Sequence, residues 1–294
     1  MIPTLIRREF WEHRNTFYPY VIVGLVVLAM LAIFSMGKAN VSVNHPGESS
    51  RPDVQFLQYG VDLFRDMSLE DRRDVMGTAY LFIAAEFGLM LIFVVFFYLL
   101  DSLYRDRKDR SILFWKSLPV SDLQTVGIKL FTGIVCVPVV YFLFIVCTQF
   151  LFLLAASVAA LGYDASVWRT LWEPSVVVFD QWADIWIYYV IVLLWQLPLY
   201  CWLVFVSSFA RSVPFIWVFG VPLAVVTVET MFGEAAISTW IGHHVVPQIG
   251  KMDLTGSVVD IGARIASVDF LITLIVSGLL LYGAVWFRGK ADEM

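Results

Sequence analysis

The sequence is poor in charged residues. Only 15% of its 294 residues are charged, against 60% hydrophobic residues and a mean hydropathy of +0.77. A soluble domain of this length carries more charge, so the composition excludes that class and indicates an integral membrane protein. The net charge of −5 says little about function, because in a membrane protein it matters on which side of the membrane each charge lies.

Cysteine and histidine are scarce as well. The three cysteines (Cys136, Cys147 and Cys201) lie inside apolar runs without the spacing of a metal site or a disulfide, so we interpret them as small buried hydrophobes. The four histidines are scattered, and the adjacent His243 and His244 cannot both face one site on a regular helix or strand. We therefore expect no metal site.

Long apolar runs separated by polar segments predict an all-α integral membrane protein with six transmembrane helices. The expected spans are residues 18–36, 78–100, 123–161, 185–209, 214–232 and 270–287. Between them we expect extracytoplasmic segments at 37–77 and 233–269 and a Trp-rich interfacial loop at 162–183. The first run is full length and is followed by a weak cleavage site, so we interpret it as a retained signal anchor.

The run from Leu123 to Gly162 allows two interpretations, because it is far longer than one bilayer crossing and has no strong polar break. It is either one helix kinked near Pro138, or two spans joined by a turn near Cys147-Thr148-Gln149. The one-helix count places both termini on the cytoplasmic side together with the basic residues near span ends. These are Arg7, Arg8, Arg14, Arg105, Arg107, Lys108, Arg110, Lys116, Arg211, Arg288 and Lys290.

Residues 2–16 combine apolar positions at three- and four-residue spacing with charges that lie mostly between them. This pattern favours an amphipathic helix in the membrane interface over a solvated lead-in.

The densest positive charge lies in the insert Leu103–Asp122, between the second and third expected spans. Ser111 can cap a short helix carrying Phe114 and Trp115, and Pro119 disfavours helix at the residue before it. Ser121 and Gln124 then match the capping-box pattern and predict a new helix start. The insert therefore predicts a short cross-piece at the membrane surface, which an ordinary positive-inside loop does not require.

This insert resembles the coupling-helix region of ABC-2 type transporter permeases, whose usual form is close to E-R-x-x-G-T-L-x-x-L-L-x-x-P-V-S. Asp106-Arg107 stands at the acidic–basic pair, Ser111 at the Thr, Ile112 and Trp115 at apolar positions, and Pro119-Val120-Ser121 at the close. Arg8-Glu9-Phe10-Trp11 resembles the opening of the same family. Arg110 replaces the usual Gly, Asp106 the usual Glu and Lys116 a Leu, so the turn and part of the docking face are expected to differ.

The resemblance implies that residues 1–294 form one ABC-2 type transmembrane domain, with an elbow helix at 2–16, a coupling-helix region at 101–122 and a re-entrant segment before the last span. It implies a permease that pairs with a second copy, as a homodimer or a related heterodimer, in the cytoplasmic (inner) membrane of a bacterial-type cell. The implied docking residues for a separate ABC ATPase subunit are Asp106, Arg107, Arg110, Ser111, Leu113, Phe114, Trp115, Leu118 and Pro119.

The energy source is expected in that partner. The chain has no G-x-x-x-x-G-K-[ST] sequence, so ATP and Mg are expected to be bound by the ATPase subunit and no cofactor by this chain. Membrane lipid is an expected partner and nucleic acid is not. The chain is then a transport subunit of an exporter rather than an enzyme, and nothing in its spans selects a substrate.

Three polar residues at membrane depth, Glu86, Gln196 and Glu229, are candidates for lining a transport pathway. The alternatives are a bond from Glu86 to a neighbouring helix and an interfacial position for Glu229. An ion- or proton-coupled secondary transporter using Glu86 and Glu229 is the competing function, but it predicts related halves with broken helices, and no such repeat is visible. A membrane enzyme would need clustered catalytic partners, which the scattered histidines do not supply.

Overall fold

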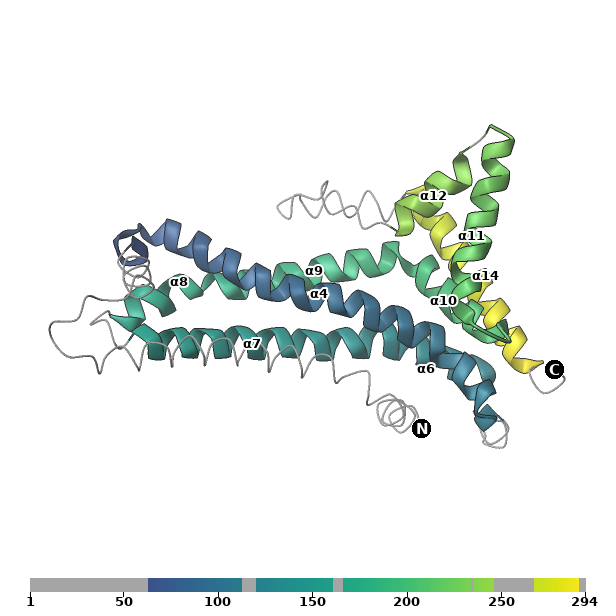
Figure 1. Cartoon of the computed structure of the whole chain (residues 1–294), viewed down its shortest axis with the longest axis horizontal. Helices are drawn as coiled ribbons and strands as arrows, with labels where there is room; N and C mark the ends of the chain where they lie inside the picture. Colours follow the sequence, from purple (N-terminus) through teal and green to yellow (C-terminus); the bar gives the residue numbers. More distant parts are fainter. Residues whose placement is uncertain (1–62, 113–119, 161–165, 234, 246–266, 291–294) are drawn as a thin grey trace, which may run out of the picture. The chain divides into compact units, whose positions relative to one another are not determined.

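The computed structural model describes residues 63–112, 120–160, 166–233, 235–245 and 267–290, and all regular structure in them is helical (Figure 1). The expected elbow helix and the first expected span lie outside the described residues. The helices that lie wholly within these residues include α4 (Leu69–Lys108), α6 (Asp122–Phe131), α7 (Val137–Ala160), α8 (Glu173–Ser175), α9 (Val177–Trp195), α10 (Leu197–Phe209), α11 (Pro214–Met231), α12 (Ala236–Val245) and α14 (Val268–Gly289). Two π-helical segments, η2 (Thr132–Cys136) and η4 (Trp168–Trp172), lie between them.

Five helical segments in the described residues are long and apolar enough to cross a membrane, which is the character of a multi-pass membrane protein. They are Leu69–Lys108, Asp122–Val158, Trp168–Trp195, Pro214–Met231 and Val268–Gly289, and α10 is a shorter apolar helix.

Helix α4 extends beyond both expected ends of the second span. It begins after Ser68, whose Oγ accepts the backbone N–H of Asp71, and has acidic residues in its first turn and basic residues in its last. Its 40 residues correspond to about 60 Å, twice the thickness of the hydrocarbon layer. Hydropathy therefore marks the membrane-embedded part of this helix but not its ends.

The segment from Asp122 to Ala160 is one helical run, and α7 passes through Cys147–Gln149 without a turn. The deviation from α-helix lies earlier, at η2, which ends two residues before Pro138. Proline has no N–H, and its ring clashes with the carbonyl four residues earlier, which here belongs to Ile134. That carbonyl accepts the hydroxyl of Tyr189 at 2.6 Å instead, so a residue of α9 replaces the bond that Pro138 cannot make.

The fourth span was predicted as one helix over 185–209, and the structure corrects this. Helix α9 ends at Trp195, Gln196 has non-helical backbone angles, and α10 begins at Leu197 with Pro198 in its first turn. Pro198 lacks the N–H donor that a continuous helix would need at this position. Its ring also clashes with the carbonyl four residues earlier. The predicted interfacial loop is also wrong for residues 168–183, most of which are helical and lead directly into α9.

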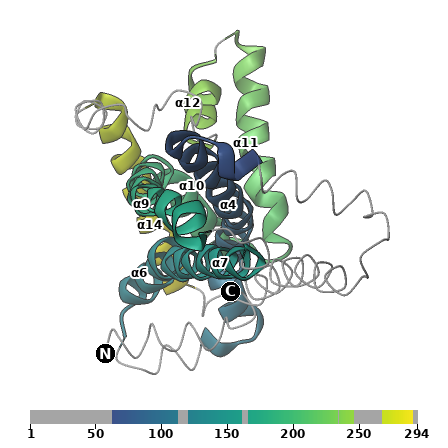
Figure 2. The same ribbon diagram turned by 90° about the vertical axis from the view of Figure 1, so that its left-hand side faces the viewer.

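The described chain forms two compact units, and α4, the α6–α7 run and α9 each pass from one to the other along the sequence. Unit 1 holds the described parts of 92–138 and 186–294. In it α10 packs along α14, and α11 and α12 lie side by side (Figures 1 and 2). A Cβ on Gly283 of α14 would lie 2.6 Å from Cε2 of Phe205, so the two helices approach closely at this glycine.

Unit 2 holds the described parts of 15–91 and 139–185, and its helices are joined by buried polar side chains. Gln149 of α7 donates to the carbonyl of Tyr80 at 3.0 Å and accepts from Trp182 Nε1 at 2.7 Å. The Tyr80 hydroxyl donates to Ser175 Oγ at 2.8 Å. These bonds satisfy polar groups that would be costly inside a membrane, so they fix how α4, α7, α8 and α9 pack in this unit.

Candidate partner-docking site

The charged insert leaves α4 through a left-handed turn. The helix ends at Lys108, and Arg110 follows with a φ of 55°. The side chains of Lys108, Asp109 and Arg110 are exposed. A left-handed residue just beyond the last turn is a common helix end, and it favours glycine because a Cβ is disfavoured there.

Position 110 is therefore where glycine would be least strained, and it is the position at which the ABC-2 pattern has glycine. The replacement by arginine was expected to change the turn. In the structure Arg110 itself takes the left-handed conformation.

Arg110→Gly should remove the cost of holding a Cβ-bearing residue at positive φ, and it should leave the melting temperature unchanged or raise it by the equivalent of at most about 1 kcal/mol. Arg110→Val should lower stability by about 1–2 kcal/mol, because β-branched residues tolerate this conformation least. Thermal unfolding in one detergent measures both. Lys108→Gly is the matched control, since it lies in the helix and should lose stability. A destabilising Arg110→Gly would contradict the left-handed turn.

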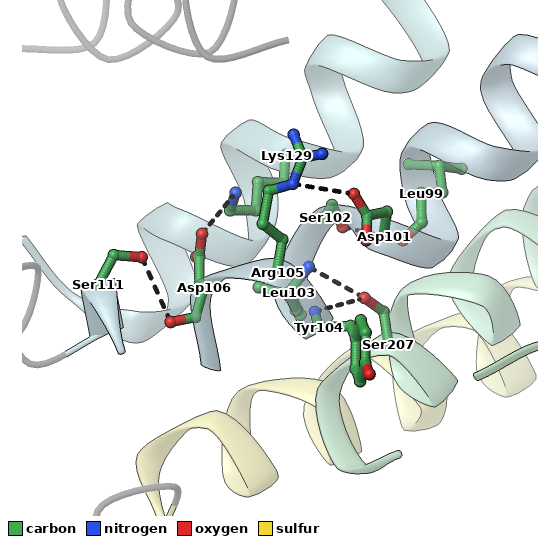
Figure 3. Close-up of polar contacts among 10 residues, drawn as sticks. All are labelled: Leu99, Asp101, Ser102, Leu103, Tyr104, Arg105, Asp106, Ser111, Lys129 and Ser207. Atoms are coloured by element: carbon green, nitrogen blue, oxygen red, sulfur yellow. Dashed lines mark hydrogen bonds and ion pairs between the residues drawn. The ribbon is translucent and has the colours of Figure 1, made fainter. Parts of the chain in front are cut away.

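Beyond the turn, Ser111 Oγ donates to the carbonyl of Asp106 at 3.3 Å, which ties the start of the insert to the last turn of α4 (Figure 3). The remaining predicted docking residues, Leu113, Phe114, Trp115, Leu118 and Pro119, lie outside the described residues.

The far flank of the insert is a capping box, as predicted from Ser121 and Gln124. Ser121 Oγ accepts the backbone N–H of Gln124, and Gln124 Oε1 accepts the backbone N–H of Ser121, both at 3.2 Å. The reciprocal bonds satisfy two donors at the start of α6. The prediction of a helix start at this point is confirmed.

Asp106 is turned inward rather than to solvent. Its Oδ1 lies 3.4 Å from Nζ of Lys129 on α6, and the side chains of Asp106 and Lys129 are 8% and 1% exposed (Figure 3). An ion pair this buried depends on both partners, because either charge alone would be left desolvated. In this conformation Asp106 holds α4 against α6.

Arg107 also makes its bonds within the chain. Its guanidinium donates to the carbonyls of Ser207 at 2.6 Å and Ala210 at 2.9 Å, at the C-terminal end of α10. Positive charge is favourable there, because the last carbonyls of a helix carry partial negative charge. Ser207 Oγ in turn accepts the backbone N–H groups of Leu103 and Tyr104 at 2.9 and 3.0 Å (Figure 3).

A second ion pair joins Asp122 in the first turn of α6 to Arg288 in the last turn of α14. The Arg288 side chain is 3% exposed. Each charge lies at the helix end whose partial charge has the opposite sign, so both helix dipoles favour the pair. The described base of the insert is thus tied to α6, α10 and α14 of unit 1.

The residues proposed to line a pathway are divided between the two units, with Glu86 in unit 2 and Gln196 and Glu229 in unit 1. Glu86 is exposed on α4 between the exposed Phe82 and Leu89, while Gln196 and Glu229 bond to opposite ends of α12. The Glu229 carboxylate accepts the N–H groups of Ile237 at 2.5 Å and Ser238 at 2.7 Å, in the first turn of that helix.

The other end of α12 is held by the break between α9 and α10. Gln196 Nε2 donates to the carbonyl of Val245 at 3.1 Å, and Trp195 Nε1 donates to that of His243 at 3.0 Å. Carboxylates at a helix start and donors at its end satisfy backbone groups that have no partner within the helix. Glu229 and Gln196 therefore cap the two ends of α12.

His244 packs inside unit 1. Its ring stacks on Trp195 with centroids 4.9 Å apart, Nδ1 donates to the Trp240 carbonyl, and Nε2 lies 2.8 Å from Thr273 Oγ1. Among the described residues, no group of three His, Cys, Asp or Glu side chains is placed to hold a metal.

Sequence reasoning missed Lys129, Asp122, Arg288 and Ser207 as parts of the insert's base. The available signal was a lysine inside an apolar run, because a charge in that position needs a buried partner. Searches against protein-family models, curated proteins and solved structures found no match to this chain.

Proposed function

We propose that this chain is the membrane-spanning subunit of an ATP-driven transporter of the ABC-2 type, acting as an exporter, with the segment 109–121 as the docking element for a separate ATPase subunit. The observation that carries the proposal is the form of the insert's two flanks. Arg110 is left-handed where the pattern has glycine, and Ser121 caps a helix where the pattern closes on serine.

The exposed turn at Lys108–Arg110 supports the same proposal, because it leaves the start of the insert accessible to a partner. The buried base supports it further. A loop that only marks the cytoplasmic side needs a few Lys or Arg residues, whereas this one is bonded to three helices through Asp106, Arg107 and Asp122.

In this proposal both termini are cytoplasmic, the first span and the elbow helix precede α4, and two copies form the translocation unit. ATP and Mg are bound by the partner subunits. Glu86 is the remaining pathway-lining candidate, because its side chain is exposed on the single chain and a carboxylate at membrane depth needs a polar or protein environment. Gln196 and Glu229 have a structural task in capping α12, which also weakens the competing relay through Glu86 and Glu229.

The test is affinity purification of the tagged full-length chain from its native membranes, followed by sequencing of co-purified proteins and an ATPase assay. We expect a P-loop ATPase subunit in the wild-type preparation and at least a tenfold reduction of it with Phe114→Ala/Trp115→Ala, because two bulky contacts are removed from the docking segment.

The matched control is Met231→Ala/Phe232→Ala, which truncates two large exposed side chains at the end of α11, on the side predicted to face away from the cytoplasm. This variant should retain the ATPase subunit. Absence of a P-loop ATPase from the wild-type preparation, or equal retention by both double variants, would overturn the proposal.

A further inference from the structure

The base of the docking segment has two flanks. One flank is bonded to α10 and the other to α14, and these two helices pack against each other. On the leading flank, Arg107 of α4 donates to the carbonyls of Ser207 and Ala210 at the end of α10. On the returning flank, Asp122 of α6 pairs with Arg288 of α14. The flanks are also tied to each other through Asp106 and Lys129.

Helices α10 and α14 are closely packed near their C-terminal ends. Besides the approach of Gly283 to Phe205, the Phe209 and Phe287 rings lie 5.7 Å apart and Phe205 and Phe287 5.9 Å apart. Close-packed interiors transmit displacement rather than absorb it. A force on either flank therefore reaches α14 as well as the two helices that carry the segment in sequence.

The Asp122–Arg288 pair joins the residue that follows the segment to α14. Asp122 is the first residue of α6, one position after the Ser121 cap, so it moves with the end of the segment. Arg288 is buried and lies one residue from the end of α14. Opposite charges at opposite helix ends resist separation, because moving them apart would leave the buried guanidinium without its carboxylate.

We propose that Asp122 and Arg288 are positioning residues that pass movement of the docking segment to α14, the last helix of unit 1. The inference rests on the proposed function, since the movement is supplied by the docked ATPase. Helix α14 would then move with the segment, in addition to α4 and α6, which flank the segment in sequence.

The experiment measures movement of α14 in the purified complex with the co-purified ATPase. Nitroxide labels are placed on Leu279→Cys in α14 and Leu223→Cys in α11, both exposed and both in unit 1, after Cys136, Cys147 and Cys201 are replaced by serine. Pulsed EPR compares the distance distribution without nucleotide and with ATP and vanadate. We expect a nucleotide-dependent shift in the parent protein, loss of that shift in Arg288→Met, and its retention in Arg288→Lys, which keeps the charge.

Lys290→Met is the control, because it removes a nearby cation that lies 4.1 Å from the centre of the Trp286 ring and does not touch Asp122. It should keep the shift. The amount of bound ATPase and the melting temperature are measured for every variant. A full shift in Arg288→Met with the ATPase bound would overturn the inference and leave the proposed function intact. Absence of the ATPase from the parent protein would instead overturn the proposed function.

Discussion

Lys129→Met should lower the stability of the detergent-purified protein by about 3 kcal/mol, read as a fall in melting temperature. The substitution fills the space of the lysine stem but removes the charge 3.4 Å from the Asp106 carboxylate, which remains almost fully buried. A buried charge that has lost its partner keeps its desolvation cost without the compensating attraction.

The companion variant is Asp106→Leu/Lys129→Met, which removes both charges. It should recover much of the loss, because replacing a buried pair by apolar side chains is often close to neutral. Lys108→Met, on the exposed last residue of α4, is the control and should change the melting temperature little. If the single and double variants were equally unstable, the loss in Lys129→Met would not come from the unpaired charge of Asp106.

Gly283→Ala should destabilise the protein by about 1–2 kcal/mol, the net of an overpacking cost and a gain in helix propensity. The added methyl carbon would lie 2.6 Å from Cε2 and 3.0 Å from Cδ2 of Phe205. That ring cannot move freely, because Trp202, Phe209 and Phe287 pack around it.

Gly278→Ala is the matched control in the same helix. A Cβ there meets no atom within 4 Å, so this variant should be neutral or slightly stabilising. The difference between the two melting temperatures isolates the α10–α14 contact from the intrinsic cost of glycine in a helix. Equal effects at both positions would show that the helices do not approach closely at Gly283.

Local sequence signals predicted local structure well. The capping box needed only Ser121 and Gln124, because both bonds form within one turn. The interpretation of the long run as one helix is confirmed, and its π-helical segment ends two residues before Pro138, the residue from which a deviation was predicted. The all-helical, membrane-type fold of the described residues was predictable from composition and apolar run length alone.

Helix ends and non-local partners were harder to predict. Hydropathy placed the second span at residues 78–100, but α4 continues to Lys108, and Asp101 and Arg105 pair along its surface as helical neighbours. Asp122 and Arg288 are 166 residues apart, and no periodicity in the sequence relates two such positions. The capping of α12 by Glu229 and Gln196 could not be predicted, because polarity at membrane depth does not distinguish a helix cap from a cavity wall.

The replacement of a backbone bond near Pro138 has a consequence for how this chain can diverge. The carbonyl of Ile134 depends on the hydroxyl of Tyr189 because position 138 cannot donate. We therefore expect positions 138 and 189 to vary together among relatives. With leucine at position 138 the Tyr189 hydroxyl is no longer needed as a donor. With phenylalanine at position 189 proline at 138 is disfavoured. Two positions 51 places apart in the chain should then change together or remain together, although only one of them carries a conspicuous residue.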